Sequence, residues 1–320
     1  MIQSGHLSTR EFWWWHAVVD SFPAAFPILF RMNSIQDRQA LSWRILNRKK
    51  LELEAIAIFD ELDRINVGCV LIKGLAADQN YPADNPRTYV DIDIAVSAAD
   101  YQRTLDHQDS SEFNARRVDL HKELRELDTL PWDQLFARSV VLDMHGGKVR
   151  IPCPEDHLRI MATHWLGDGG ENRDRLWDIY YAVANRSPEF DWSKCLDPVS
   201  SIRRGWVICT IGLAHKYLDL DISDLPFEAE AKQIPEWVTN MLEKEWSNNM
   251  RSRPLQACLR DPKLFLRQLR KRIPPNPIAA TIQMEAPIDE RGRTLLQLQN
   301  IGQRMIPSIR RLVHVATGRR

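Results

Sequence analysis

Two aspartates stand two positions apart in the apolar segment Tyr89–Val96 of this 320-residue chain. Every even-numbered residue of the segment is apolar, which predicts a strand with Asp91 and Asp93 together on its other face, about 7 Å apart. Carboxylates that close repel each other, and a divalent cation with oxygen ligands neutralises both. Because Asp is disfavoured in strands, the pair indicates a metal site, and a solvated strand face is the alternative.

A phosphate-binding turn is predicted upstream of this strand. The apolar run 67–72 predicts a buried strand that ends at Lys73 and Gly74, before a short predicted helix over 75–80. Glycine allows the backbone to approach a phosphate, a helix start offers free N–H groups, and a lysine adds positive charge. We expect Lys73 and Gly74 to hold phosphate. Arg87, just before the aspartate strand, either joins them or holds its loop by a salt bridge.

A third carboxylate is expected from a strand over 116–121, in which Asp119 and His121 lie opposite the apolar face. Three carboxylates beside a phosphate cradle outline a two-metal phosphoryl-transfer site. One metal would be held with a triphosphate and the other would activate an acceptor hydroxyl at Asp119. Asp143 lies in similar local sequence and is a rival, but it adjoins a predicted Gly146-Gly147 hairpin, where a polar face meets water.

The elements that must position these residues form three parts. We expect an N-terminal helical segment over 1–65, an α/β domain over 66–152 and a helical substrate or acceptor domain over 153–320, an α+β fold with a small mixed sheet. The hairpin strands fall at 140–145 and 148–151. Helices are predicted at 36–65, 98–108, 132–138, 155–166, 174–185, 201–218, 229–245, 262–272 and 294–315.

These residues in this order resemble the signature of an uncharacterised nucleotidyltransferase family in the DNA-polymerase-beta-like superfamily. The resemblance covers residues 67–183 and rests on the segments 71–74, 81–82, 87, 91–94, 118–121, 154–158, 164 and 176–178. It implies a minimal nucleotidyltransferase fold and Mg²⁺-dependent (or Mn²⁺-dependent) transfer of a nucleotidyl group from an NTP. It also implies that Asp91, Asp93 and Asp119 are the catalytic metal ligands.

Three further residues are candidates for the acceptor side. His121 would assist the acceptor or hydrogen-bond an aspartate. His164 and Asp178 would line an acceptor pocket, although a structural pair between two helices is the favoured interpretation. The acceptor itself, a small molecule, a protein or an RNA, is left open by the sequence, as are the base of the NTP and the oligomeric state.

The composition of the chain bears on its possible partners and on its location in the cell. Formal net charge is zero, but the residues from 251 onward carry 15 Lys and Arg against 4 Asp and Glu. Two explanations of this asymmetry are open. The basic segment either binds an acidic partner such as a nucleic acid, or packs on the acidic body of its own chain. The five cysteines are scattered without a C-x-x-C pair, and no signal-peptide pattern or membrane span is visible. We therefore expect a cytoplasmic protein.

Two other functions stay open. The segment 97–116 is short for the family, which favours a degenerate, non-catalytic member that binds a nucleotide or a partner in the same cleft. A weaker alternative is a tRNA-modifying toxin, for which the basic C-terminal segment is the support.

Overall fold

The computed structural model describes residues 35–303, except for 111–117, 125, 249, 251, 252, 254, 259, 260, 290 and 292. The first part of the chain holds these elements in order: α3 (Ile35–Arg64), β1 (Cys69–Leu71), α4 (Leu75–Asp78), β2 (Ile92–Val96), α5 (Tyr101–Ser110), β3 (Val118–Lys122), α6 (Trp132–Arg138), β4 (Val140–Met144) and β5 (Gly147–Ile151).

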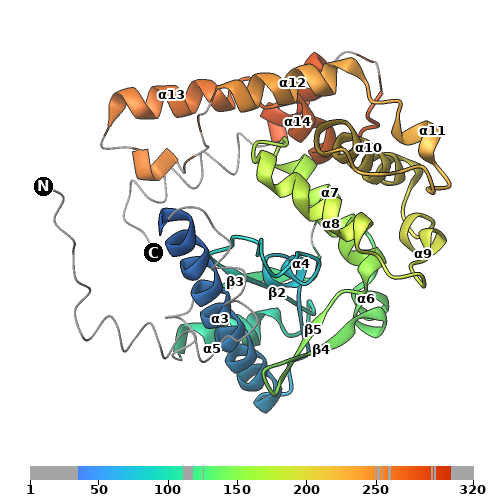
Figure 1. The fold of residues 1–320 in the computed structure, drawn as a ribbon. Helices are drawn as coiled ribbons and strands as arrows, with labels where there is room; N and C mark the ends of the chain where they lie inside the picture. Colours follow the sequence, from blue (N-terminus) through green and yellow to red (C-terminus); the bar gives the residue numbers. More distant parts are fainter. Residues whose placement is uncertain are drawn as a thin grey trace, which may run out of the picture.

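Two small sheets form from these strands. The first has the order β1-β2-β3, with β2 antiparallel to β1 and parallel to β3, so the sheet is mixed. The second is the predicted hairpin, β4 with β5. Together with the surrounding helices (Figure 1), they confirm the predicted α+β class.

The central strand differs from its prediction. It begins at Ile92, so the expected alternation over Tyr89–Val96 is wrong in its first half: Tyr89 is buried and Val90 is 58% exposed. The solvated strand face, which was the alternative interpretation, does not form in β2, because Asp93 and Ala95 are buried as well. A central strand covered on both faces has no solvated side, and this fact depends on the packing of distant elements.

Both faces of the first sheet are covered. One face packs on α3 and on the hairpin, in a core that includes Leu51, Ile58, Ile92, Ile94 and Val149. The other face, which carries Ala95, packs on α6 and on a residue of the long helix that follows the hairpin. The helix α3 is therefore part of the core of the α/β unit.

The remainder of the chain is helical. Its elements are α7 (Pro154–Gly167), η2 (Arg173–Arg175), α8 (Leu176–Ala184), α9 (Trp192–Leu196), α10 (Ser201–Leu218), α11 (Glu228–Ala231), α12 (Glu236–Ser247), η3 (Leu255–Cys258), α13 (Pro262–Arg272), α14 (Pro277–Gln283) and a helix over 294–303. The helices α7, α8 and α10 share one hydrophobic core that includes Trp206 and Leu213.

Several of the predicted helices lie where expected, notably α6, α10 and α13. The helix predicted over 229–245 is divided into α11 and α12, because Pro235 stands at the start of the second. The last predicted helix is described as far as residue 303, and the remainder of its range lies outside the described residues. Within the described part of the chain, no helix has the length and apolar character needed to cross a membrane.

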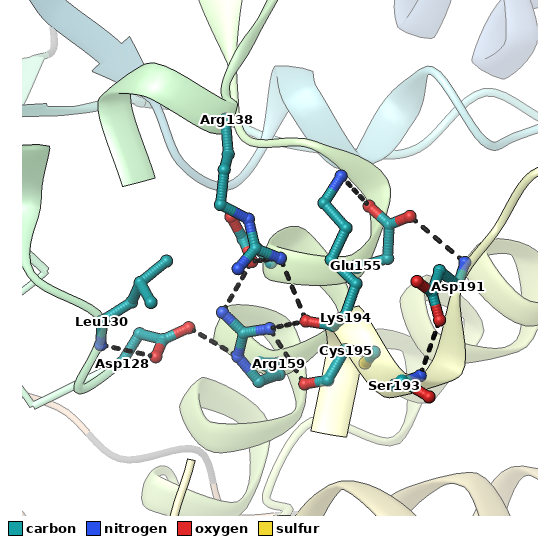
Figure 2. A network of polar contacts seen from close by, with 10 residues as sticks. Asp128, Leu130, Arg138, Glu155, Arg159, Asp191, Ser193, Lys194 and Cys195 are labelled. Atoms are coloured by element: carbon teal, nitrogen blue, oxygen red, sulfur yellow. Dashed lines mark hydrogen bonds and ion pairs between the residues drawn. The ribbon is translucent and has the colours of Figure 1, made fainter. Parts of the chain in front are cut away.

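A buried network of charges joins the α/β unit to the helical part (Figure 2). Arg159 of α7 donates to Asp128 at 2.9 Å and to Asp156 at 2.6 Å, and also to the backbone carbonyls of Lys194 and Cys195 in α9. Arg138 at the end of α6 pairs with the same Asp156 at 2.8 Å. Because Asp128 follows the first sheet, this network fixes the sheet against α7 and α9.

Candidate functional site

A cavity of about 360 Å³ lies where the first sheet meets α7 and α8. This volume is within the range of small-molecule sites. It contains all of the site residues predicted from sequence except His121, namely Lys73, Gly74, Arg87, Asp91, Asp93, Asp119, His164 and Asp178. His121 does not line the cavity, but it contacts the carboxylates of Asp93 and Asp119. The rival Asp143 is exposed on β4 of the other sheet and does not line the cavity.

Asp93, Asp119 and His121 form an acidic cluster on adjacent parallel strands. Asp93 of β2 is the register partner of Asp119 of β3, so side chains from the two strands meet on one face. His121 Nε2 lies 3.1 Å from Asp119 Oδ2 and 3.4 Å from Asp93 Oδ1. One potential ligand atom from each of the three residues lies within 4.8 Å of the others.

The charges in this cluster are strongly coupled. Burial alone would raise the pKa of the Asp93 carboxyl, but the hydrogen bond from His121 and the charge of Lys73 hold it below its usual value. Burial also opposes protonation of His121, yet its hydrogen bonds to Asp119 and Asp93 raise the pKa of the imidazole. Both shifts show that the carboxylates attract positive charge at this point.

The donor set fits a divalent cation. Two carboxylates supply the hard oxygen ligands that Mg²⁺ and Mn²⁺ prefer, and the imidazole nitrogen suits Mn²⁺ better than Mg²⁺. Asp91 lies apart from this cluster, although it lines the same cavity and is exposed to it. The strand begins one residue after Asp91, so the sequence periodicity could not place its side chain.

The predicted phosphate turn lies beside the acidic cluster. Lys73 Nζ forms an ion pair with Asp93 Oδ1 at 2.6 Å. Gly74 has φ 46° and ψ −103°, a conformation that L residues rarely adopt, and a Cβ there would lie 3.5 Å from the Asp91 carbonyl oxygen. The helix that follows has only four residues, which is shorter than predicted, so its dipole adds little.

Arg87 and Asp178 form a buried pair that links the α/β unit to α8. The guanidinium donates to both carboxylate oxygens, at 2.7 and 2.8 Å, and Tyr81 Oη donates to the same carboxylate at 2.6 Å. Burial alone would raise the pKa of Asp178, but Arg87 and Tyr81 hold it below its usual value. Of the two sequence interpretations of Arg87, this contact matches the salt bridge that holds the loop.

The favoured structural pair between His164 and Asp178 does not form. Asp178 takes Arg87 as its partner, whereas His164 pairs with Asp168 of the same helix end at 3.2 Å. His164 and Asp168 are both partly exposed in the cavity. The segment from His164 to Arg175 therefore supplies a second wall of the site.

Sequence reasoning missed most of this second wall. Met161, Trp165, Asp168, Asn172 and Arg175 line the cavity from α7 and from the connection to α8. The available signal was the polar, glycine-containing segment 167–175 between two apolar helices, since such connections often carry functional residues.

The site thus combines a mixed sheet with an acidic cluster, a glycine turn and an enclosed polar cavity, the features expected of a protein that handles a metal-bound anion. Residues 38–219, more than half of the chain, match the family model described as "Uncharacterised nucleotidyltransferase". The chain belongs to this uncharacterised nucleotidyltransferase family, as its motifs predicted.

One solved structure that this chain is similar to is an antigenic nucleotidyltransferase-like protein from Paracoccidioides brasiliensis. It has 16% sequence identity and a TM-score of 0.40, over 57% of this chain and 93% of that chain. Among curated proteins, none matches this chain.

Proposed function

We propose that the protein is a Mg²⁺-dependent or Mn²⁺-dependent nucleotidyltransferase that transfers a nucleotidyl group from an NTP to an acceptor hydroxyl. The observation that carries this proposal is the convergence of Asp93, Asp119 and the Lys73-Gly74 turn, from three different strands or strand ends, on one cavity. Membership of the nucleotidyltransferase family supports the same reaction class.

The roles of the residues follow from their places in the cavity. Asp93 and Asp119, with His121 behind them, would hold the divalent cation, whose contribution is to neutralise developing phosphate charge and to acidify an acceptor hydroxyl. Asp91 lines the same cavity outside this cluster and would serve the triphosphate side. Lys73 and the Gly74 backbone would hold phosphate oxygens.

The acceptor would enter along the wall formed by α7. His164 and Asp168 are partly exposed there and form a pair that can take or deliver a proton at the acceptor hydroxyl. The cavity continues past Asp168 and Asn172 into a neighbouring groove lined by Glu171 and Trp246. The acceptor would therefore contact the helical part of the chain.

The test compares Asp93, which lines the cavity, with Asp143, an exposed aspartate on β4 that does not line it. Asp93→Asn should lower label transfer from α-labelled NTPs, added with Mg²⁺ to a cell extract, by at least about a hundredfold. Asp143→Asn is the matched control and should retain full transfer. Separation of the labelled products into RNA, protein and small molecules would identify the class of acceptor.

A second readout does not depend on the acceptor. Mn²⁺ titration by calorimetry should show weakened binding for Asp93→Asn and Asp119→Asn, and unchanged binding for Asp143→Asn. Full transfer by the Asp93→Asn protein would contradict the site assignment.

One observation favours a non-catalytic alternative. The Lys73 ammonium and the His121 imidazole already neutralise Asp93 in the structure, so a nucleotide could bind here without a metal. Such a protein would bind NTP equally well with Mg²⁺ or with EDTA, and it would transfer no label. A nucleotidyltransferase should instead bind NTP more tightly when Mg²⁺ is present.

A further inference from the structure

The cavity contains one cationic side chain that its neighbours do not neutralise. Lys73 pairs with Asp93 and Arg87 pairs with Asp178. Arg175 lines the same cavity, yet within the described residues it has no carboxylate at ion-pair distance. A half-buried guanidinium without a counter-ion is unfavourable unless a ligand supplies the negative charge.

The electrostatics around Arg175 agree with this. Burial, followed by the nearby positive charge of Arg87, lowers the pKa of the Arg175 guanidinium. Asp178 and Asp91 favour the charged form but do not offset these two effects, so Arg175 is less stabilised than an ordinary surface arginine. Binding of an anion would remove this disadvantage, whereas binding of a neutral group would not.

The position of Arg175 favours the phosphate side of the cavity over the acceptor side. Arg175 lines the cavity together with Lys73, Gly74 and Asp91. Its guanidinium is influenced by Arg87, Tyr81 and Asp91 on the loop that leads into β2, and by Asp178 on α8. The carbonyl oxygen of Asp91 lies beside Gly74, at the turn where phosphate is expected.

We propose that Arg175 binds the polyphosphate of the nucleotide, so that the helical part of the chain contributes to nucleotide binding as well as to the acceptor site. This inference rests on the proposed function, because it assigns a further residue to the same nucleotide. Arg87 then acts as a positioning residue: its pairing with Asp178 fixes α8 and η2, which carry Arg175, against the α/β unit.

The test is a binding experiment with Arg175→Gln and a matched control, Arg173→Gln. Both changes remove one positive charge from the same 3-10 helix, but Arg173 is exposed over the ring of Trp246 and lines the neighbouring groove. Because Arg175 has no ion-pair partner in the part of the chain that the structure describes, its replacement should leave the melting temperature unchanged. Arg175→Lys, which keeps a positive charge but loses the planar fork, should give an intermediate affinity.

The probes are ATP, GTP, CTP and UTP with Mg²⁺, together with inorganic tripolyphosphate. Arg175→Gln should weaken binding of every NTP that the wild type binds, and of tripolyphosphate, by about ten- to hundredfold. The loss should be smaller for the corresponding nucleoside monophosphate. Arg173→Gln should change each affinity by less than about twofold, as for an exposed charge.

Three results would overturn the assignment. Unchanged NTP affinity in Arg175→Gln would refute the role of Arg175 and leave the proposed function intact. A loss confined to one base would place Arg175 at the base instead of the phosphates. Absence of any NTP or tripolyphosphate binding by the wild type would refute both the inference and the proposed function.

Discussion

Asp93 is only 6% exposed although it lines the cavity. It is held there by Lys73 from the end of β1 and by His121 from β3, so three strands contribute to one carboxylate. This burial excludes the alternative interpretation, in which Asp93 lies on a solvated strand face. It also makes the isosteric change to Asn a better probe than truncation to Ala, which would leave Lys73 without its partner.

Gly74 provides a prediction at the scale of a single residue. Its φ of 46° with ψ −103° is strained for any L residue, and the Asp91 carbonyl lies 3.5 Å from the position of an added Cβ. Gly74→Ala should therefore lower the free energy of unfolding by about 1–3 kcal/mol and move the Lys73 turn away from Asp93. Urea denaturation and NTP binding would measure both effects.

The matched control for this change is Gly205→Ala in α10. An added Cβ there meets no atom within 4 Å, and glycine is unfavourable inside a helix. This variant should be slightly more stable than the wild type. Equal stability of the two variants would contradict the strain assigned to Gly74.

His157 provides a prediction of pH dependence. It is 3% exposed in α7, and burial lowers the pKa of its imidazole to about 4, below the value near 6.5 of an unfolded histidine. Because the folded pKa is the lower one, the stabilising contribution of the neutral imidazole is complete above pH 6.5 and is lost as the pH falls towards 4. The loss should reach about 3 kcal/mol below pH 4.

The measurement is the free energy of unfolding between pH 4 and 7 for the wild type and His157→Gln. The variant lacks the titrating group, so its stability should fall less steeply over this range. Parallel curves for the two proteins would show that His157 does not titrate as described.

At the scale of elements, the Arg87–Asp178 pair joins the loop before β2 to α8. Both side chains are 8% exposed, and breaking a buried pair from one side leaves an uncompensated charge. Asp178→Asn should lower the free energy of unfolding by about 3–5 kcal/mol. It should also weaken nucleotide binding, because α8 and η2 lose their attachment to the loop.

Tyr81→Phe is the graded control for this pair. It removes one hydrogen bond to Asp178 but leaves the ion pair, so it should cost about 1 kcal/mol. Denaturant titrations of the two variants and the wild type would give the comparison. A smaller cost for Asp178→Asn than for Tyr81→Phe would contradict the proposed attachment.

At the scale of the whole molecule, the network around Arg159 connects the α/β unit with the helical part (Figure 2). Arg159 is 1% exposed, and Asp156 is fully buried. Arg159→Met would leave Asp128 and Asp156 with less positive charge in a buried site. We expect a loss of about 3–5 kcal/mol in the free energy of unfolding.

Arg204→Met tests whether burial is the cause. Arg204 pairs with Glu230 at 2.8 Å, but both side chains are exposed, so this variant should lose less than about 1 kcal/mol. Guanidinium unfolding of both variants gives the two values. Similar losses at the two sites would show that the buried network does not have this role.

The structure also shows one place where the basic C-terminal segment packs. Lys271 of the basic C-terminal segment lies 3.0 Å from Glu171 and 2.6 Å from Glu245. At Lys271, the basic segment thus packs on acidic residues of its own chain, in agreement with one of the two interpretations left open by the sequence. Such pairing leaves less charge available for a nucleic acid.

The sequence by itself determined the class of the fold, the family and most of the lining of the cavity. Local patterns sufficed for these, since strand ends, glycine turns and helix periodicity place Lys73, Gly74, Asp93 and Asp119 through short-range geometry alone. The hairpin, α6, α10 and α13 were predicted for the same reason.

The tertiary structure decided which charges are neutralised and which are available. Three features depend on how α7 and α8 pack against the sheet. Arg87 pairs with Asp178, and His164 is therefore left to pair with Asp168. Arg175 lines the cavity without an ion-pair partner among the described residues. No periodicity encodes these contacts, because their partners lie far apart in the chain. The strand that carries Asp93 is likewise a central strand whose two faces are covered by different elements, so the alternative of a solvated strand face does not hold.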